Sequence, residues 1–323
     1  MSSEDQLFLG VALHPDSIRI VESDGNFITN VAEKELIHTF GVELFRADTD
    51  ELNSVEDALV SLIQAGQIRS KKAGIVIDSS LVHIKKVPVP LGLDQDMTRE
   101  HLLWEAEQFL ISPLNEYVVD FEKLPFQTKE GNPLFLLICI RNQIVSNINR
   151  MVRNAGLRLI NIDVGVFSKI RVLIKSNDLK ENIPYLILET SSGCINIIVL
   201  KKREFFLKQT LEYSDHENTD IDISIIYNHI EKELKKLLFG HDLGEGIDDF
   251  GEIFCLGGKA AENLTDHIRS ISKTPVTIFN PFKKLRLNAA LRGSETIAEN
   301  PDRFTSAIGA VVKQSPALVE NAS

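Results

Sequence analysis

Short apolar runs, each about the length of a strand, open the chain. Leu7–Leu13 and Ile18–Glu22 are separated by the polar turn His14–Ser17, and a third run begins at Phe27. Apolar runs of this length that alternate with turn residues are typical of strands joined by tight turns. The pattern predicts strand, turn, strand, turn and strand.

The same pattern returns in the second half of the chain. Tyr185–Thr190 and Ile195–Leu200 are separated by Ser191–Cys194, and a third run begins at Phe205. Self-similar openings of two halves indicate a duplicated unit. We therefore expect two similar domains built around related sheets.

Helical and strand periodicities alternate through the rest of the chain, which favours layered α/β domains. The predicted helices are Ser54–Gly66, Asp96–Leu110, Gln143–Ala155, Gly165–Leu173, Ile223–Phe239, a helix from Ala260 to Ile271, and Arg303–Lys313. The predicted strands are Ala73–Ile77, Val82–Val89, Tyr117–Leu124, Leu134–Arg141, Arg158–Asp163, Glu252–Leu256 and Val276–Ile278. A polar, acidic loop is expected at Asp215–Asp222.

The helix Asp96–Leu110 has one apolar side, and either Asp96 or Thr98 can cap its first turn. Trp104 lies on this helix. It fits core packing, which we favour, or an anchor for a partner peptide.

Composition and charge narrow the class of protein. The 323 residues fit about two domains, and 43% are hydrophobic while 25% are charged, which predicts a globular chain with a large core. The formal net charge of −11 argues against nucleic acid or anionic lipid as a partner, because both require a basic surface. No apolar run reaches the roughly 18 residues of a membrane span, and the acidic start lacks the basic residues of a secretion signal.

The three cysteines, Cys139, Cys194 and Cys255, lie in or beside apolar runs. This placement predicts buried free thiols in a reducing compartment. No cysteine or histidine pair has the spacing of metal ligands.

The order of the motifs resembles the type IV pilus assembly protein PilM family, relatives of FtsA in the actin-like superfamily, over roughly residues 7–313. The segments that carry the resemblance are Leu9–His14, Ile18–Glu22, Val87–Pro90, Trp104–Phe109, Val118–Phe121, Asn154–Leu157, Ile162–Val164, Leu188–Thr190, Glu231–Lys236, Leu256–Ala260, Asn280–Phe282 and Ala307–Ala310. No single segment is specific, but their order is hard to obtain by chance.

The resemblance implies an α/β, actin-like (ribonuclease H-like) fold with two domains, 1–175 and 184–313, followed by a flexible tail, 314–323. It implies an extra subdomain at about 81–140 in the first domain and a small subdomain at about 215–251 in the second. It also implies a cytoplasmic protein of the inner-membrane assembly platform. Such a protein contacts other platform proteins and binds the cytoplasmic tail of a PilN-like membrane protein, without entering the membrane itself.

The resemblance places a nucleotide cleft between the two hairpin turns, and the first turn departs from the family pattern. Family members with a working site carry Asp in the first strand and Gly just after it, but here these positions are Ala12 and His14. Alanine cannot hold a magnesium-bound water, and a histidine side chain obstructs close approach of phosphate. Ser17 also belongs to this turn. Arg19 replaces a lysine and fits either a phosphate contact or a strand face.

The second half keeps more of the pattern. Glu189 retains a carboxylate and is the one candidate for a metal ligand, although the family has Asp there. Ser192 and Gly193 follow in the second turn, and Lys235 lies where the family holds the base and ribose. The segment Gly257-Gly258-Lys259-Ala260 is similar to the adenosine-binding turn. Its glycines fit either approach of phosphate or ribose to a helix N-terminus, or a strand-to-helix turn alone.

With one of the two expected carboxylates missing, we expect ATP and Mg²⁺ to bind weakly or not at all, with little or no hydrolysis. The favoured interpretation is a catalytically degenerate PilM-like scaffold that captures an extended peptide. One alternative is an active ATP-dependent switch organised by Glu189. The other is a platform domain of a related secretion system.

Overall fold

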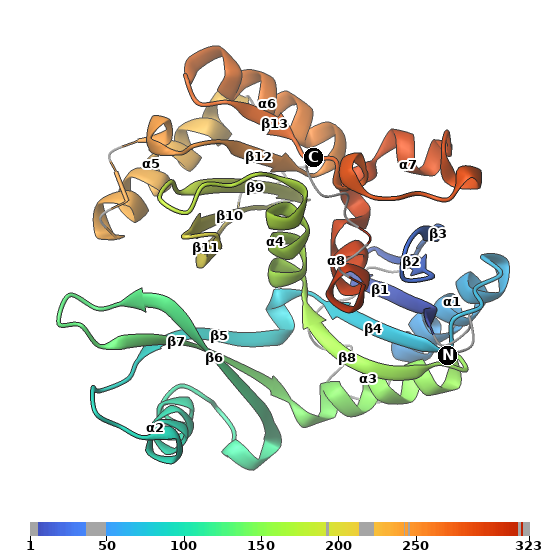
Figure 1. Ribbon diagram of the computed structural model, residues 1–323, viewed down its shortest axis with the longest axis horizontal. Helices are drawn as coiled ribbons and strands as arrows, with labels where there is room; N and C mark the ends of the chain where they lie inside the picture. Colours follow the sequence, from blue (N-terminus) through green and yellow to red (C-terminus); the bar gives the residue numbers. More distant parts are fainter. Residues whose placement is uncertain are drawn as a thin grey trace. The chain divides into compact units, whose positions relative to one another are not determined.

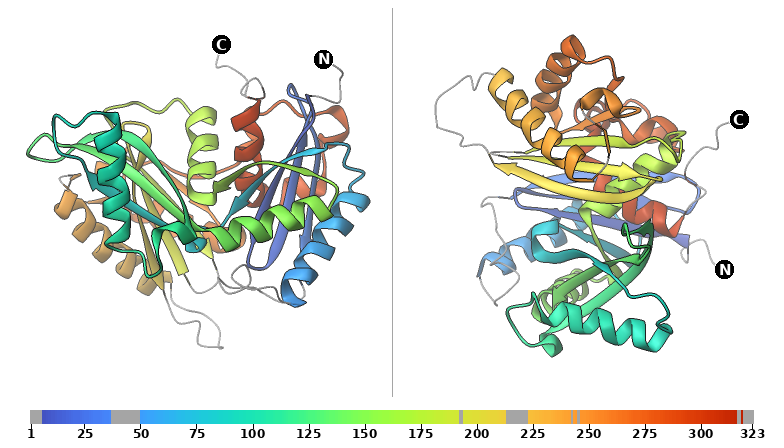
Figure 2. Two further views of the ribbon diagram at one scale, coloured as in Figure 1. Left: turned by 90° about the horizontal axis from the view of Figure 1, so that it is seen from below. Right: turned by 90° about the vertical axis from the view of Figure 1, so that its left-hand side faces the viewer.

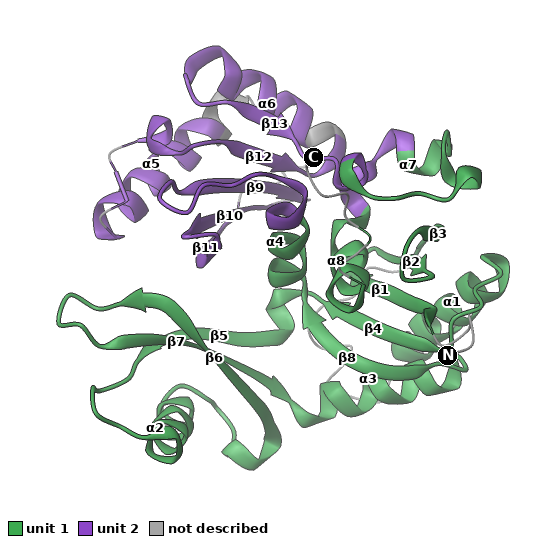
Figure 3. Ribbon diagram, viewed as in Figure 1, with its two compact units in different colours: residues 1–172, 284–297, 304–323 green, residues 173–283, 298–303 purple. Residues whose placement is uncertain are grey.

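The computed structural model describes residues 6–36, 50–191, 194–212, 223–241, 243–244, 246–315 and 318, arranged in two compact units (Figure 1). Unit 1 comprises Met1–Val172, Lys284–Ile297 and Phe304–Ser323, and unit 2 comprises Leu173–Lys283 and Ala298–Arg303 (Figure 3). The last helix thus belongs to unit 1, although the sequence division placed it with the second half. The acidic loop at 215–222 lies outside the described residues.

The sheet of unit 1 has the strand order β3-β2-β1-β4-β8. Its strands are β1 (Phe8–His14), β2 (Ser17–Ser23), β3 (Ile28–Glu35), β4 (Lys72–Ile77) and β8 (Arg158–Val164). The first three form an antiparallel meander, and β4 and β8 continue the sheet in parallel with β1. The predicted strand–turn–strand opening is therefore confirmed.

Helices cover both faces of this sheet (Figure 2). Leu9, Val11 and Leu13 of β1 point into a core shared with α1 (Asp50–Ala65) and α3 (Asn142–Asn154). On the opposite face Gly10 lies against α8 (Thr305–Gln314), where an added Cβ would come within 2.1 Å of the Ala307 carbonyl oxygen. Glycine is needed at this position because a helix backbone crosses the strand directly above it.

A further three-stranded sheet with one helix follows β4 within unit 1. This sheet has the order β5-β7-β6, with β5 (Val82–Pro88), β6 (Tyr117–Gln127) and β7 (Pro133–Arg141) all antiparallel. The helix α2 (Gln95–Glu107) packs on one face of this sheet through Leu102 and Ala106.

Two expectations about α2 were wrong. The side chain of Asp94 caps the helix by accepting a hydrogen bond from the Met97 N–H at 2.8 Å, so neither Asp96 nor Thr98 is the cap. Trp104 is 55% exposed and does not pack in the core. Its position in the helical repeat is opposite Leu102 and Ala106, and therefore faces away from the sheet.

The sheet of unit 2 repeats the plan of unit 1, with the order β11-β10-β9-β12-β13. Its strands are β9 (Tyr185–Ser191), β10 (Cys194–Lys201), β11 (Glu204–Glu212), β12 (Ile253–Leu256) and β13 (Val276–Ile278). Its helices are α5 (Ile223–His241) and α6 (Gly258–Ile271). The chain enters unit 2 along α4 (Gly165–Ser176), and a short α7 (Glu295–Glu299) follows the 3-10 turns near residue 290.

The cysteines are free thiols, as predicted. Cys139 and Cys255 are buried, and Cys194 is half-buried. Burial raises the pKa of the Cys139 thiol and that of the Cys255 thiol to about 11.

Candidate functional site

The first hairpin turn places Ala12, His14, Ser17 and Arg19 together at one end of β1 and β2. Ala12 is 1% exposed and lies directly opposite Arg19 in the strand register. Its methyl group offers no ligand for a metal or for a metal-bound water. His14 is half-buried at the end of β1, opposite Ser17, where the family pattern has a glycine.

Arg19 is bound within the sheet. Its Nε lies 2.7 Å from Oε1 of Glu33 on β3, and its Nη2 lies 3.9 Å from Oδ1 of Asp16. The guanidinium is 8% exposed, and a buried charge of this kind requires a partner. Ser17 donates its hydroxyl to the same Asp16 carboxylate at 2.7 Å. Arg19 and Ser17 are therefore both bound by carboxylates of the sheet and turn, as the strand-face interpretation of Arg19 requires.

The second hairpin keeps its carboxylate in a polar setting. Glu189 is half-buried on β9, and the Asn196 side-chain amide donates to its Oε2 at 3.4 Å. The neighbouring Thr190 donates its hydroxyl to the Leu256 carbonyl at 3.1 Å and so ties β9 to the end of β12. The predicted site residues Ser192 and Gly193 lie outside the described residues.

The Gly257-Gly258 turn requires glycine for geometry. Both residues have positive φ, 125° and 58°, and a Cβ on Gly257 would lie 1.9 Å from the Thr190 hydroxyl oxygen. The turn opens directly into α6, where unpaired N–H groups and the helix dipole favour an anion.

A carboxylate of the chain itself already lies at this helix N-terminus. Oδ2 of Asp302 accepts the N–H of Gly257 at 2.6 Å and the N–H of Gly258 at 3.1 Å. Asp302 is 6% exposed. Sequence analysis missed Asp302 because it lies 44 residues beyond the turn. No local pattern links the two segments.

The remaining predicted residues of unit 2 are on helices. Lys235 of α5 forms an ion pair with Glu231, with Nζ 2.8 Å from Oε1, and both side chains are largely exposed. Nearby, an ion pair and hydrogen bond from Lys236 lower the pKa of Glu233. Lys259 and Ala260 lie in the first turn of α6, but their side chains lie outside those described.

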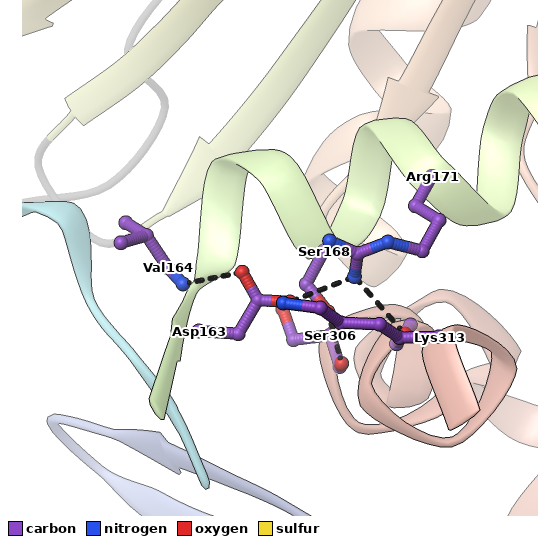
Figure 4. A network of polar contacts seen from close by, with 7 residues as sticks. Asp163, Val164, Ser168, Arg171, Ser306 and Lys313 are labelled. Carbon is purple, nitrogen blue, oxygen red and sulfur yellow. Dashed lines mark hydrogen bonds and ion pairs between the residues drawn. The ribbon is translucent and has the colours of Figure 1, made fainter. Parts of the chain in front are cut away.

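A polar network in unit 1 centres on Asp163, at the end of β8 (Figure 4). Its Oδ1 accepts the Val164 N–H at 2.8 Å, and its Oδ2 lies 2.7 Å from Arg171 of α4 and 4.0 Å from Lys313 of α8. Arg171 also donates to the Gly309 carbonyl at 3.1 Å.

Small residues let α4 and α8 approach closely beside this network. Ser168 of α4 donates to the Ser306 carbonyl at 2.7 Å, and a Cβ on Gly309 would lie 2.3 Å from the Ser168 carbonyl oxygen. Sequence analysis included Asp163 in the segment Ile162–Val164, which carries part of the family resemblance, but gave it no partner. Among the described residues, no group of three or more His, Cys, Asp or Glu side chains has the geometry to hold a metal ion.

Two sheets of equivalent strand order, each opened by a β-hairpin, define the class: the chain has the actin-like fold. The sequence profile of the family described as type IV pilus assembly protein PilM matches residues 10–228, which is more than half of the chain. The chain belongs to this family.

One solved structure supports the fold, and two others align more weakly. A PilM-PilN type IV pilus biogenesis complex aligns with a TM-score of 0.75 and 17% identity, covering 95% of this chain and 98% of that one. A Bacteroides thetaiotaomicron protein with an actin-like ATPase fold and unknown function aligns at 0.48 and 14% identity, covering 86% and 92%. The cytoplasmic domain of EpsL from the type II secretion system of Vibrio cholerae aligns at 0.46 and 8%, covering 96% and 94%.

None of the described helices combines the length and the apolar character needed to cross a bilayer.

Proposed function

We propose that this chain is a scaffold of a type IV pilus assembly platform that binds the cytoplasmic tail of a PilN-like membrane protein. It works in the cytoplasm and reaches the inner membrane through that partner. We further propose that it binds Mg-ATP weakly or not at all. Family membership supports the first statement, and the Asp302 carboxylate at the Gly257-Gly258 turn supports the second.

A bound nucleotide would have to compete with Asp302 for the same backbone donors. The two N–H groups that open α6 point toward an anion at the helix N-terminus, and Asp302 already accepts both. A phosphate would have to displace a nearly buried carboxylate from these two donors, which costs about 1–3 kcal/mol or more for a charged group. In unit 1 the Arg19 guanidinium is neutralised by Glu33, and Ala12 supplies no carboxylate.

A calorimetric titration of the purified chain with ATP and Mg²⁺ tests this directly, after co-purified nucleotide has been excluded. We expect no measurable binding at micromolar nucleotide. Micromolar affinity would contradict the degenerate cleft and favour the ATP-dependent switch. The retained carboxylate of Glu189 is the observation that favours that second candidate.

Restoring the family pattern sharpens the test. The variant Ala12→Asp with His14→Gly should bind Mg-ATP at least about tenfold more tightly than the parent, because it returns a carboxylate for metal water and opens the turn. Ala12→Ser with His14→Gly is the matched control, since it opens the turn without adding charge. Equal affinity of both variants and the parent would mean that these positions are not the cause of weak binding.

The three-stranded sheet of unit 1 offers a surface for an extended peptide. The β5-β7-β6 sheet has α2 on one face, while Ile84, Ile138 and Val118 lie on the other. Ile84 and Ile138 are half-buried and Val118 is 45% exposed, so this face presents apolar surface. Asp120 and Glu122 share the face and are exposed. Apolar side chains beside acids fit a peptide that alternates apolar and basic residues.

The peptide proposal is tested with a labelled peptide of the cytoplasmic residues of a PilN-like membrane protein from the same organism. Fluorescence anisotropy should show saturable binding without nucleotide, and a scrambled peptide should not bind. Val118→Asp with Ile138→Asp should weaken binding at least about tenfold by placing charge in the apolar contact. Ile271→Asp, at an exposed position of unit 2, is the control and should bind as the parent does. Full affinity in the double variant would refute this surface.

A further inference from the structure

The outer face of α2 presents an apolar surface that the peptide proposal does not use. Met97 and Trp104 lie on the side opposite the sheet and are 49% and 55% exposed. We call Met97 and Trp104 the Trp104 face. An exposed tryptophan beside a second large apolar side chain is characteristic of protein contacts rather than of ordinary surface.

The indole of Trp104 is oriented by its neighbours and flanked by acids. Its ring stacks on His101 with centroids 6.1 Å apart, and Nε2 of His101 lies 3.2 Å from the Pro88 carbonyl oxygen. Glu100 and Glu107 occupy the same side of the helix and are exposed. Neither forms an ion pair with another residue in the described part of the chain. The Trp104 face is thus an apolar anchor with a negative rim.

A hollow of complementary character lies at the β3 edge of the other sheet of unit 1. It has a volume of about 300 Å³ and is lined by Phe27, Leu285, Arg286, Leu287 and Arg292. We call it the Phe27 hollow. Its floor is apolar, and Arg286 and Arg292 are exposed. Within the described ranges neither guanidinium has an ion-pair partner.

Backbone hydrogen bonds hold the walls of the hollow in place. The Ile28 N–H donates to the Arg286 carbonyl at 2.8 Å, and the Asn288 N–H donates to the Ile28 carbonyl at 3.0 Å. The carboxylate of Asp24, the nearest acid along the β2–β3 turn, accepts the N–H groups of Asn26 and Phe27. It is therefore engaged in the turn.

We propose that the Trp104 face of one copy of this chain docks in the Phe27 hollow of a second copy. An indole fits an apolar floor that is flanked by guanidiniums, which also stack on aromatic rings. Glu100 and Glu107 supply the carboxylates that Arg286 and Arg292 lack. A pocket of this size suits a single aromatic anchor.

Geometry makes the contact intermolecular. Helix α2 and strand β3 lie at opposite ends of unit 1, so one copy cannot satisfy both of its own surfaces (Figure 3). A contact between two different surfaces is heterologous and leaves one of each free, so it extends into an open chain of copies unless it closes as a ring. The net charge of −11 on each copy opposes association. At physiological ionic strength, dissolved ions screen this repulsion over distances longer than about 8 Å.

The chain has one tryptophan, so its intrinsic fluorescence reports on this face alone. The full chain is followed by tryptophan emission and by sedimentation velocity over a dilution series from about 1 to 300 µM at physiological salt. We expect a blue shift that rises with concentration in step with the appearance of dimers and larger species, with half-association in the tens of micromolar, as for small interfaces. A monomer with constant emission over the whole range would overturn the proposal.

Two variants separate the surfaces. Met97→Ala with Trp104→Ala removes the anchor, and Arg286→Glu with Arg292→Glu reverses the charge of the hollow. Each variant alone should be monomeric at 300 µM, because each lacks one partner surface. Phe239→Ala is the control, since Phe239 is 88% exposed in unit 2 and should leave association unchanged.

Mixing the two variants gives the decisive readout. The hollow variant keeps Trp104 and the anchor variant keeps the hollow, so the mixture should form 1:1 heterodimers and nothing larger. The sole tryptophan of the mixture should shift to the blue as the tryptophan-free variant is added. Homodimers of either variant, or a mixture that stays monomeric while the parent associates, would refute the pairing of these two surfaces. The experiment needs neither nucleotide nor PilN peptide, so its result is independent of the proposed function.

Discussion

The two halves of the chain have the same strand order, yet matching positions of their first hairpins carry different chemistry. Aligned through their strand registers, Ala12 of β1 corresponds to Glu189 of β9, and Arg19 corresponds to Asn196. In unit 1 the cation is neutralised across the sheet by Glu33, whereas in unit 2 the acid is held by an amide. The difference shows that a duplicated backbone plan does not preserve the chemistry of its turns.

The largest expected effect concerns a position where the two halves cannot be exchanged. Gly10 corresponds to Ile187 in the second sheet, but a Cβ on Gly10 would lie 2.1 Å from the Ala307 carbonyl oxygen. Gly10→Val should destabilise the fold by about 3 kcal/mol or more, because α8 must move off the sheet. Thermal unfolding measures this.

Gly240→Ala is the matched control for Gly10→Val. Gly240 lies in α5 with nothing within 4 Å of an added Cβ, so alanine should be neutral or stabilise by up to about 1 kcal/mol. A Gly10 variant as stable as the Gly240 variant would show that α8 does not pack on β1 as described.

The next prediction compares the ion pair of Arg19 in unit 1 with that of Lys235 in unit 2. Glu33→Gln removes the closer of the two carboxylates beside the nearly buried Arg19 guanidinium and should cost about 2–4 kcal/mol, since the remaining Asp16 carboxylate is 3.9 Å away. Glu231→Gln removes the partner of Lys235 at an exposed site and should change stability by less than about 0.5 kcal/mol. Urea unfolding of both variants checks the contrast. Equal costs would mean that Arg19 is hydrated rather than bound in the sheet.

Substitutions of Asp302 test whether its carboxylate stabilises the Gly257-Gly258 turn. Asp302→Ala should lower stability by about 1–3 kcal/mol because two part-buried N–H groups lose a charged acceptor. Asp302→Asn should lower it by less, since an amide oxygen can still accept. Chemical denaturation separates the two. If Asp302→Ala is as stable as the parent, the carboxylate does not hold the turn and the competition argument against ATP fails.

The smallest expected effect concerns the rates at which the three cysteine thiols are alkylated. At pH 8 alkylation should label Cys194 first, and Cys139 and Cys255 roughly 100-fold more slowly than an ordinary thiol, because their pKa values of about 11 suppress the thiolate. The pKa of each buried thiol is raised on folding. Its contribution to stability is therefore complete below about pH 8.5 and declines as pH rises toward 11. Mass spectrometry of labelled peptides checks the order, and rapid labelling of Cys255 would contradict its burial.

The sequence predicted those features that depend on local periodicity. The short apolar runs Leu7–Leu13 and Tyr185–Thr190, each followed by turn residues, were enough to predict both hairpins, and the strand registers agree. Helix α2 was predicted from the helical spacing of apolar residues that include Leu102 and Ala106, and both are buried in the core that α2 shares with the β5-β7-β6 sheet. The exposure of Trp104 was missed because periodicity reports which side is apolar, and this helix has large apolar residues on both sides.

Less of the candidate site could be predicted from the sequence. The loss at Ala12 and His14 was visible because both occupy fixed places in a motif. The side-chain contacts of the polar groups near these positions could not be predicted, because they join distant segments. Arg19 pairs with Glu33 across a sheet, and Asp302 binds a turn 44 residues earlier. Side-chain pairing between remote segments follows from tertiary structure alone.

The packing of α8 on β1 has a consequence for biosynthesis. A ribosome makes β1 long before Thr305–Gln314, so the Gly10 face of the nascent sheet stays uncovered while almost all the intervening residues are translated. Exposed nascent surface of this kind is prone to aggregate until it is covered. The packing of unit 1 is therefore complete only once α8 has been translated.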